Sequence, residues 1–220
     1  MDKLESEIRR LTQPVNGQYP RPWMTQSTDP ASSRLFIVGM NQASTYDTRT
    51  VGTHSHFINC LFNRGDESGH QLYDRLTGRP SRTRANIQNL VDHLVAIGIS
   101  DVIETNVICY STPMSADLRE TQHRNGVMQG REIFDKLLDI VQPEVLIVHG
   151  SGTVVEMNKL AGTQLPRPNF NVAEPISHQW RNRQAIIIPS LAPPAFNRWA
   201  NESDGHMDKI CSLVAARLKA

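Results

Sequence analysis

The sequence has few cysteines, few lysines and no long apolar run, and each shortage narrows the possible classes of protein. Its three cysteines, Cys60, Cys109 and Cys211, lie too far apart in the chain for a four-thiolate cluster or a CxxC pair. We interpret them as reduced core thiols. No apolar run could span a bilayer, and the N-terminus lacks the pattern of a signal peptide. We therefore expect a cytoplasmic protein without a membrane partner.

The charges nearly balance, with 23 basic and 22 acidic side chains, so net charge gives no argument for a nucleic-acid partner. Only five of the basic residues are Lys and eighteen are Arg, the side chain that forks onto phosphates. Four arginines lie in the segment RLTGRPSRTR, residues 75–84, which contains no acidic residue. Arg79, Arg82 and Arg84 are candidate phosphate contacts, and a solvated loop is the alternative interpretation.

Short apolar segments alternate with amphipathic ones and predict a single α/β domain over residues 1–220. The expected strands are Leu35 to Gly39, Asp101 to Ile108, Glu144 to His149 and Gln184 to Pro189, with helices over about 85–97, 116–141, 153–160 and 205–218. This pattern predicts a three-layer α/β/α fold with a four-stranded, mainly parallel sheet. We expect residues 1–33 to form a short helix, at about 2–12, and a proline-rich wrapping arm.

Polar residues follow each expected strand. In parallel sheets ligands bind beyond the carboxyl ends of the strands, so these residues should face one cleft. They are Gly39-Met40-Asn41-Gln42, Glu104-Thr105-Asn106, His149-Gly150-Ser151-Gly152 and Pro189-Ser190.

The order of these motifs resembles that of the uracil-DNA glycosylase superfamily. The sequence GMN at 39–41 is similar to the G-M-N-P or G-I-N-P loop of its single-strand-selective and mismatch-specific branches. The segment PSLAPPAFNRW, residues 189–199, is similar to the H-P-S-P loop with its downstream proline, asparagine and tryptophan. Asn106 matches an asparagine in the second apolar strand. The resemblance covers roughly Leu35 to Trp199.

The resemblance implies a monofunctional DNA glycosylase that acts as a monomer, without cofactor, on a nucleotide flipped out of DNA. Asn41 would orient the attacking water, and backbone N–H groups of Met40 and Gln42 would bind the base. Asn106 would read the base edge, because its amide presents a donor and an acceptor side by side. The further roles that the resemblance implies are a pocket completed by Gly39, His149 and Ser190, a base-stacking aromatic (Tyr46 or Phe57), and a minor-groove wedge (Leu191, Phe196 or Arg198).

Two departures from the family pattern bear on the substrate. Ile188 stands where the family has the histidine that precedes Pro-Ser, and Gln42 replaces the proline of the first loop. Losing one preorganised donor typically lowers the rate by about a hundredfold to a thousandfold. Three interpretations remain open: a different base, such as a hypermodified phage base, with His149, His178 or a polar loop residue stabilising its charge; slow excision; or binding without excision.

Other interpretations of single motifs also remain open. Asn41 could be only a turn residue, and Asn106 could cap a neighbouring loop. The sequence THSH, residues 53–56, could place His54 and His56 in the site of a metal-dependent hydrolase, with Asp47 as a third ligand, although that spacing is common without a metal. We expect no metal.

Overall fold

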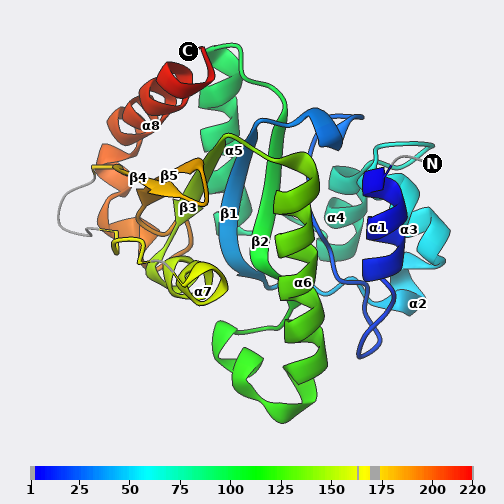
Figure 1. Cartoon of the computed structure of the whole chain (residues 1–220). Helices are drawn as coiled ribbons and strands as arrows, with labels where there is room; N and C mark the ends of the chain where they lie inside the picture. Colours follow the sequence, from blue (N-terminus) through cyan, green and yellow to red (C-terminus); the bar gives the residue numbers. More distant parts are fainter. Residues whose placement is uncertain (1–2, 163, 169–173, 220) are drawn as a thin grey trace.

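A five-stranded sheet forms the centre of the computed structural model, which describes residues 3–162, 164–168 and 174–219 (Figure 1). The strand order is β2-β1-β3-β5-β4. The strands are β1 (Leu35–Gln42), β2 (Val102–Ser111), β3 (Val145–His149), β4 (Ile176–Trp180) and β5 (Arg183–Ile188). The pairs β1–β2, β1–β3 and β3–β5 are parallel, as the continuous apolar runs predict, because a parallel strand is buried on both faces.

The expectation of four strands was wrong, because β4 adds a fifth strand at the edge of the sheet. It pairs antiparallel with β5 through a two-residue hairpin turn, in which Arg181 and Asn182 both have positive φ. Ser177, His178 and Gln179 of this strand are exposed. A polar edge strand has no apolar run to reveal it, and Arg-Asn is not a usual hairpin dipeptide.

Helices cover both faces of the sheet and give the expected three layers (Figure 1). Leu90 of α5 and Ile210 of α8 belong to the apolar cluster on one face, and Phe134 of α6 and Met157 of α7 to the cluster on the other. The longer helices are α1 (Lys3–Leu11), α5 (Arg82–Ala96), α6 (Arg124–Val141), α7 (Ser151–Ala161) and α8 (Ser203–Leu218). None of the described helices combines the length and apolarity needed to cross a membrane.

Residues 48–77 form three short helices that the apolar pattern did not predict. They are α2 (Thr48–Val51), α3 (His54–Leu61) and α4 (Gly69–Thr77). Each begins at a side-chain cap, provided by Asp47, Thr53 and Ser68 respectively. Similarly, the helix expected from residue 116 starts only at Arg124, after the 3₁₀ turns Ser115–Arg119 and Thr121–His123.

The arm that follows α1 lies along the outer edge of β2. Met24 and Glu104 exchange two backbone hydrogen bonds, of 2.8 and 2.9 Å. Further along the chain, 3₁₀ turns at Pro30–Ser32, Phe196–Arg198 and Ala200–Glu202 connect the longer elements. Pairing with β2 holds the arm beside the carboxyl ends of the strands, where Arg21 contributes to the site described next.

Candidate functional site

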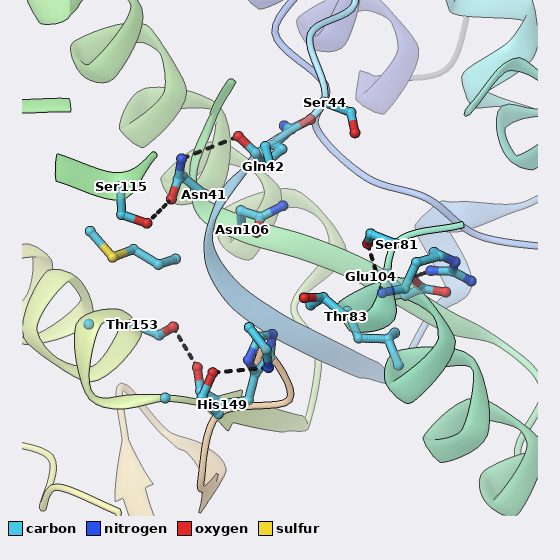
Figure 2. Close-up of a pocket in the computed structure, with 18 of the residues that line it drawn as sticks. Asn41, Gln42, Ser44, Ser81, Thr83, Glu104, Asn106, Ser115, His149 and Thr153 are labelled. Carbon is cyan, nitrogen blue, oxygen red and sulfur yellow. Dashed lines mark hydrogen bonds and ion pairs between the residues drawn. The ribbon is translucent and has the colours of Figure 1, made fainter. Parts of the chain in front are cut away.

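A cavity of about 540 Å³ lies at the carboxyl ends of the parallel strands. It is the position that the topology favours for a ligand, and it is closed at its sides by the starts of α5 and α7 and by the N-terminal arm (Figure 2). Of the residues expected from the sequence, the cavity brings together Met40, Asn41, Gln42, Arg84, Asn106, His149 and Ser190.

Two lining residues, Asn106 and His149, belong to a row that runs across four strands on one face of the sheet. Asn106 pairs with Gly39 in the register of β1 and β2, and His149 pairs with Ile188 in the register of β3 and β5. Gly39 lies between the two polar residues. A Cβ atom there would lie 2.7 Å from Oδ1 of Asn106 and 2.9 Å from Nε2 of His149. Both side chains therefore converge over Gly39, and only glycine leaves them room.

The side chain of Asn106 makes no hydrogen bond within the described residues, and it lines the cavity. The amide can therefore offer its donor and acceptor to a ligand. His149 is only 9% exposed, and its Nδ1 atom has no hydrogen-bond partner among the described residues. Burial lowers the pKa of His149 to about 4, so the imidazole is neutral at pH 7 and carries one N–H.

The amide of Asn41 is held at both ends, by residues that follow β2. Its Nδ2 donates to Oγ1 of Thr112 over 3.0 Å. Its Oδ1 accepts from Oγ of Ser115 over 2.9 Å, and its Nδ2 also donates to the carbonyl of Gln42 over 3.2 Å (Figure 2). The hydroxyl of Thr112 donates its own proton to the carbonyl of Met114, so it must act as acceptor toward Asn41. This arrangement fixes which end of the amide is the oxygen. One lone pair of Oδ1 remains for a further donor.

Gln42 follows on the same strand and is 5% exposed. Its Nε2 donates to the carbonyl of Arg21 over 2.6 Å, whereas its Oε1 has no partner among the described residues. Because Gln42 lines the cavity, that buried oxygen is a candidate acceptor for a ligand N–H.

The turn from β3 into α7 brings Ser190 and Met40 into the wall. Gly150 adopts φ of 88°, and a Cβ atom on it would lie 3.3 Å from Cβ of Ser190. A Cβ atom on Gly152 would lie 2.7 Å from Sδ of Met40. Oγ of Ser190 accepts from the backbone N–H of Ala192 over 3.1 Å, which ties the loop after β5 to this wall.

Arg84 lines the cavity but is not available as a simple phosphate contact, because it forms an ion pair with Glu104. Both side chains are 11% exposed, and Arg84 also donates to Oε1 of Gln88 over 2.8 Å. Burial lowers the pKa of Arg84 to about 10, which leaves it charged at pH 7. Arg79 and Arg82 are exposed and lie outside the cavity lining.

Arg21 is a lining residue that the sequence did not reveal. Its guanidinium lies over the rings of Tyr46 and Tyr73, at 5.2 and 5.8 Å, and donates to the hydroxyl of Tyr46. No carboxylate pairs with it among the described residues. The other two charged lining residues, Arg84 and Glu104, neutralise each other, so Arg21 gives the cavity a net positive charge.

The two aromatic residues expected to stack on a base do not reach the cavity. Tyr46 is 1% exposed and Phe57 is not exposed at all, and the two rings pack edge to face in the core. The aromatic residue that does line the cavity is Tyr73 of α4. Tyr73 belongs to a helix that the apolar pattern did not predict, which explains why the sequence analysis named Tyr46 and Phe57 instead.

The loop after β5 offers a smaller wedge than expected. Leu191 is fully buried in the apolar cluster beneath α8, and Phe196 is half-buried and packs against Trp199. These two side chains are held in the core and cannot act as a wedge in this conformation, because moving Leu191 into DNA would first expose a buried apolar side chain to water. Arg198 is exposed and is the one of the three that can reach a partner in this conformation.

His54 and His56 do not form a shared site. His54 contacts Oγ1 of Thr12 over 2.9 Å, whereas Nε2 of His56 contacts Oε2 of Glu67 over 3.0 Å. Within the described part of the chain, the one group of three residues that could hold a metal ion is His56, Cys60 and Glu67, none of which lines the cavity.

A scan against models of known protein families found no match, and a search of curated proteins found no significantly similar sequence. Function therefore has to be inferred from the residues of the cavity.

Proposed function

We propose that the chain is a monofunctional DNA glycosylase, which binds a modified or damaged base in the cavity and hydrolyses its N-glycosidic bond. The observation that carries this proposal is the convergence of Asn106 and His149 over Gly39, with the fixed amide of Asn41 in the same cavity. These groups come from three different strands. Excision of a base requires one group that binds the base edge, one that stabilises the leaving group and one that positions the attacking water, and these three side chains can fill those roles.

Asn41 is suited to orient the attacking water. Thr112 and Ser115 hold its amide, and the remaining lone pair of Oδ1 can accept a hydrogen bond from a water molecule. An amide is a weak base, so its contribution is position rather than proton removal. An oxocarbenium-like transition state requires little more, because the leaving base departs before the water has fully attacked.

Asn106 and His149 are suited to hold the base and to accept the charge on it as it departs. The amide of Asn106 presents a donor and an acceptor to a base edge. The neutral imidazole of His149 can donate one N–H to the departing anion in a site of low polarity. Arg21 adds a positive charge that favours an anionic leaving group.

The lining contains no lysine, which supports hydrolysis by water rather than Schiff-base chemistry. The exposed Arg79, Arg82 and Arg198 are the candidate contacts with DNA phosphates. A cavity of about 540 Å³ is roomy for one pyrimidine ring and favours a base that carries a substituent, such as a hypermodified phage base.

Binding of modified or damaged DNA without excision is the second candidate function. Two observations favour it: Asn41 already uses both ends of its amide within the protein, and Ile188 is buried and cannot donate a hydrogen bond. On this alternative the same cavity would bind a flipped base and leave the glycosidic bond intact.

The test is an abasic-site assay with the purified chain in EDTA. The substrates are DNAs that contain uracil, damaged bases or natural hypermodified phage bases, and the readouts are alkali-dependent strand scission and release of free base. Release from one class of DNA supports the glycosylase. Tight binding without release from any DNA supports the second candidate, and neither release nor binding contradicts both.

Two variants test the assigned roles. Asn41→Ala should abolish excision and spare DNA binding, because it removes the group that positions the water. Asn106→Asp should change which base is accepted, because it replaces a donor by an acceptor. Asn201→Ala, an exposed asparagine outside the cavity, serves as the matched control. Wild-type excision by both cavity variants would show that the site is assigned wrongly.

A further inference from the structure

Three potential metal ligands meet between α3 and α4, on the chain that leads to the wall of the cavity. His56 and Cys60 lie one helical turn apart on α3, and Glu67 lies in the loop before α4. Nε2 of His56 is 3.0 Å from Oε2 of Glu67, and Sγ of Cys60 is 3.6 Å from the imidazole nitrogen and 3.7 Å from the carboxylate oxygen.

These three distances match the edges of a tetrahedral zinc site. Zinc binds sulfur at about 2.3 Å and nitrogen or oxygen at about 2.0–2.2 Å, so ligand atoms of one tetrahedron are about 3.5–3.6 Å apart when one is sulfur and about 3.3 Å apart when neither is. The cluster needs adjustments of only a few tenths of an ångström to accept the ion. In the metal-free chain, hydrogen bonds among the three side chains hold them at this spacing, and the ion would replace those bonds.

The surroundings hold the ligands in place. Ser68 and Gln71 form a capping box at the start of α4 and so fix the loop that carries Glu67. Arg75 donates to Oε1 of Glu67 over 2.7 Å and to Oε2 over 3.0 Å. Its bond to Oε1 is of the kind that orients a metal-binding carboxylate, while its bond to Oε2 must yield to the ion.

We propose that His56, Cys60 and Glu67 bind one zinc ion that joins α3 to α4. A thiolate together with an imidazole favours zinc over magnesium or calcium, which prefer oxygen ligands. The thiol of Cys60 gives its proton to the solvent when the ion binds, and the thiolate and the carboxylate then balance the charge of the ion. The side chain of His56 is 40% exposed, which leaves an entry path and a fourth position for water.

The role of this ion is structural. None of the three ligands lines the cavity, but α4 carries Tyr73, which does. A zinc ion that fixes α4 against α3 therefore fixes the aromatic wall of the cavity. The inference does not depend on what the cavity binds.

Cobalt provides the first measurement, because Co²⁺ in a tetrahedral site with a thiolate has charge-transfer and visible absorption bands that zinc lacks. The full chain is freed of metal with a chelator and titrated with Co²⁺, and then with Zn²⁺. We expect the bands to saturate at one equivalent of Co²⁺ and to disappear as Zn²⁺ displaces it. Zinc should also raise the Tm of the metal-free protein. Wild-type protein without these bands would overturn the proposal.

Two ligand variants and one control separate this site from adventitious binding. Cys60→Ser should lose the charge-transfer band, and His56→Gln should bind zinc at least about a hundredfold more weakly, since even the outer partners of a ligand contribute about tenfold to a hundredfold. His56 is partly exposed, so its replacement should not endanger folding. Cys211→Ser removes another buried cysteine, on the buried face of α8, and should keep the bands. Unchanged bands in Cys60→Ser would also overturn the proposal.

Discussion

Gly39→Ala is the substitution that the geometry of the cavity floor penalises most directly. A Cβ atom at this position would lie 2.7 Å from Oδ1 of Asn106 and 2.9 Å from Nε2 of His149. Ordinary contacts begin at 3.4 Å, so the amide oxygen has to retreat by about 0.7 Å and the imidazole by about 0.5 Å. The substitution therefore displaces both groups that we assign to the base, without removing either.

The expected effect is on function rather than on folding. A misplacement of about 1 Å in an active site lowers a rate by as much as about 10²-fold, so excision by Gly39→Ala should fall by roughly tenfold to a hundredfold. Alanine suits a strand better than glycine does, by about 0.5–1 kcal/mol. This gain in stability offsets part of the energetic cost of displacing the two side chains, and the free energy of unfolding should change by less than about 1 kcal/mol.

The assay is release of free base at a single enzyme concentration, followed over time, together with urea unfolding of each variant. Gly205→Ala is the matched control, because a Cβ atom on this helical glycine meets nothing within 4 Å. If the protein binds without excising, the dissociation constant for the modified DNA replaces the rate. Wild-type function in Gly39→Ala would refute the assignment of the base to the row formed by Asn106, Gly39 and His149.

Two further predictions concern pH and the aromatic wall. Burial holds the pKa of His70, His149 and His206 at about 4, below the 6.5 of an unfolded histidine, so only the unfolded chain takes up these protons between the two values. The free energy of unfolding in urea should therefore fall from pH 6.5 to pH 4, by up to about 1.4 kcal/mol per pH unit for each histidine; a flat profile would contradict the burial of these rings. Tyr73→Leu should weaken the binding of DNA with a flipped base by about 1–3 kcal/mol, measured by titration, because it removes the stacking surface. Phe57→Leu should lower stability and leave that affinity unchanged, and equal losses in both variants would argue against stacking on Tyr73.

The strands that the sequence revealed are those that the sheet buries on both faces. Leu35 to Val38 and Val145 to Val148 are continuous apolar runs, because neither face of a central parallel strand meets water. β4 escaped detection because its exposed edge permits polar residues. Helices α2 to α4 escaped because they are short, and because their caps, rather than an apolar period, mark where they begin.

The candidate site was predictable to the extent that topology determines it. Any polar residue just after a parallel strand faces the same edge, and this places Asn41, Asn106 and His149 near one another. Thr112 and Ser115, which orient the amide of Asn41, reach it only because the chain folds back toward β1 after the end of β2. No sequence pattern around Thr112 and Ser115 predicts this path of the chain. Arg21 depends likewise on the pairing of the arm with β2.

For the glycosylase that we propose, the register of the sheet favours a substrate other than uracil. His149 and Ile188 are neighbours on adjacent strands and point to the same face. In the family pattern that the sequence resembles, a histidine stands at the position of Ile188, so relative to that pattern the imidazole of this chain lies one strand nearer to Asn106. Adjacent strands are about 4.8 Å apart, which is close to the width of a pyrimidine ring. An imidazole displaced by that distance cannot donate to the same atom of the same base while Asn106 remains hydrogen-bonded to the base edge. A glycosylase with this floor would therefore stabilise charge at a different position of the leaving base.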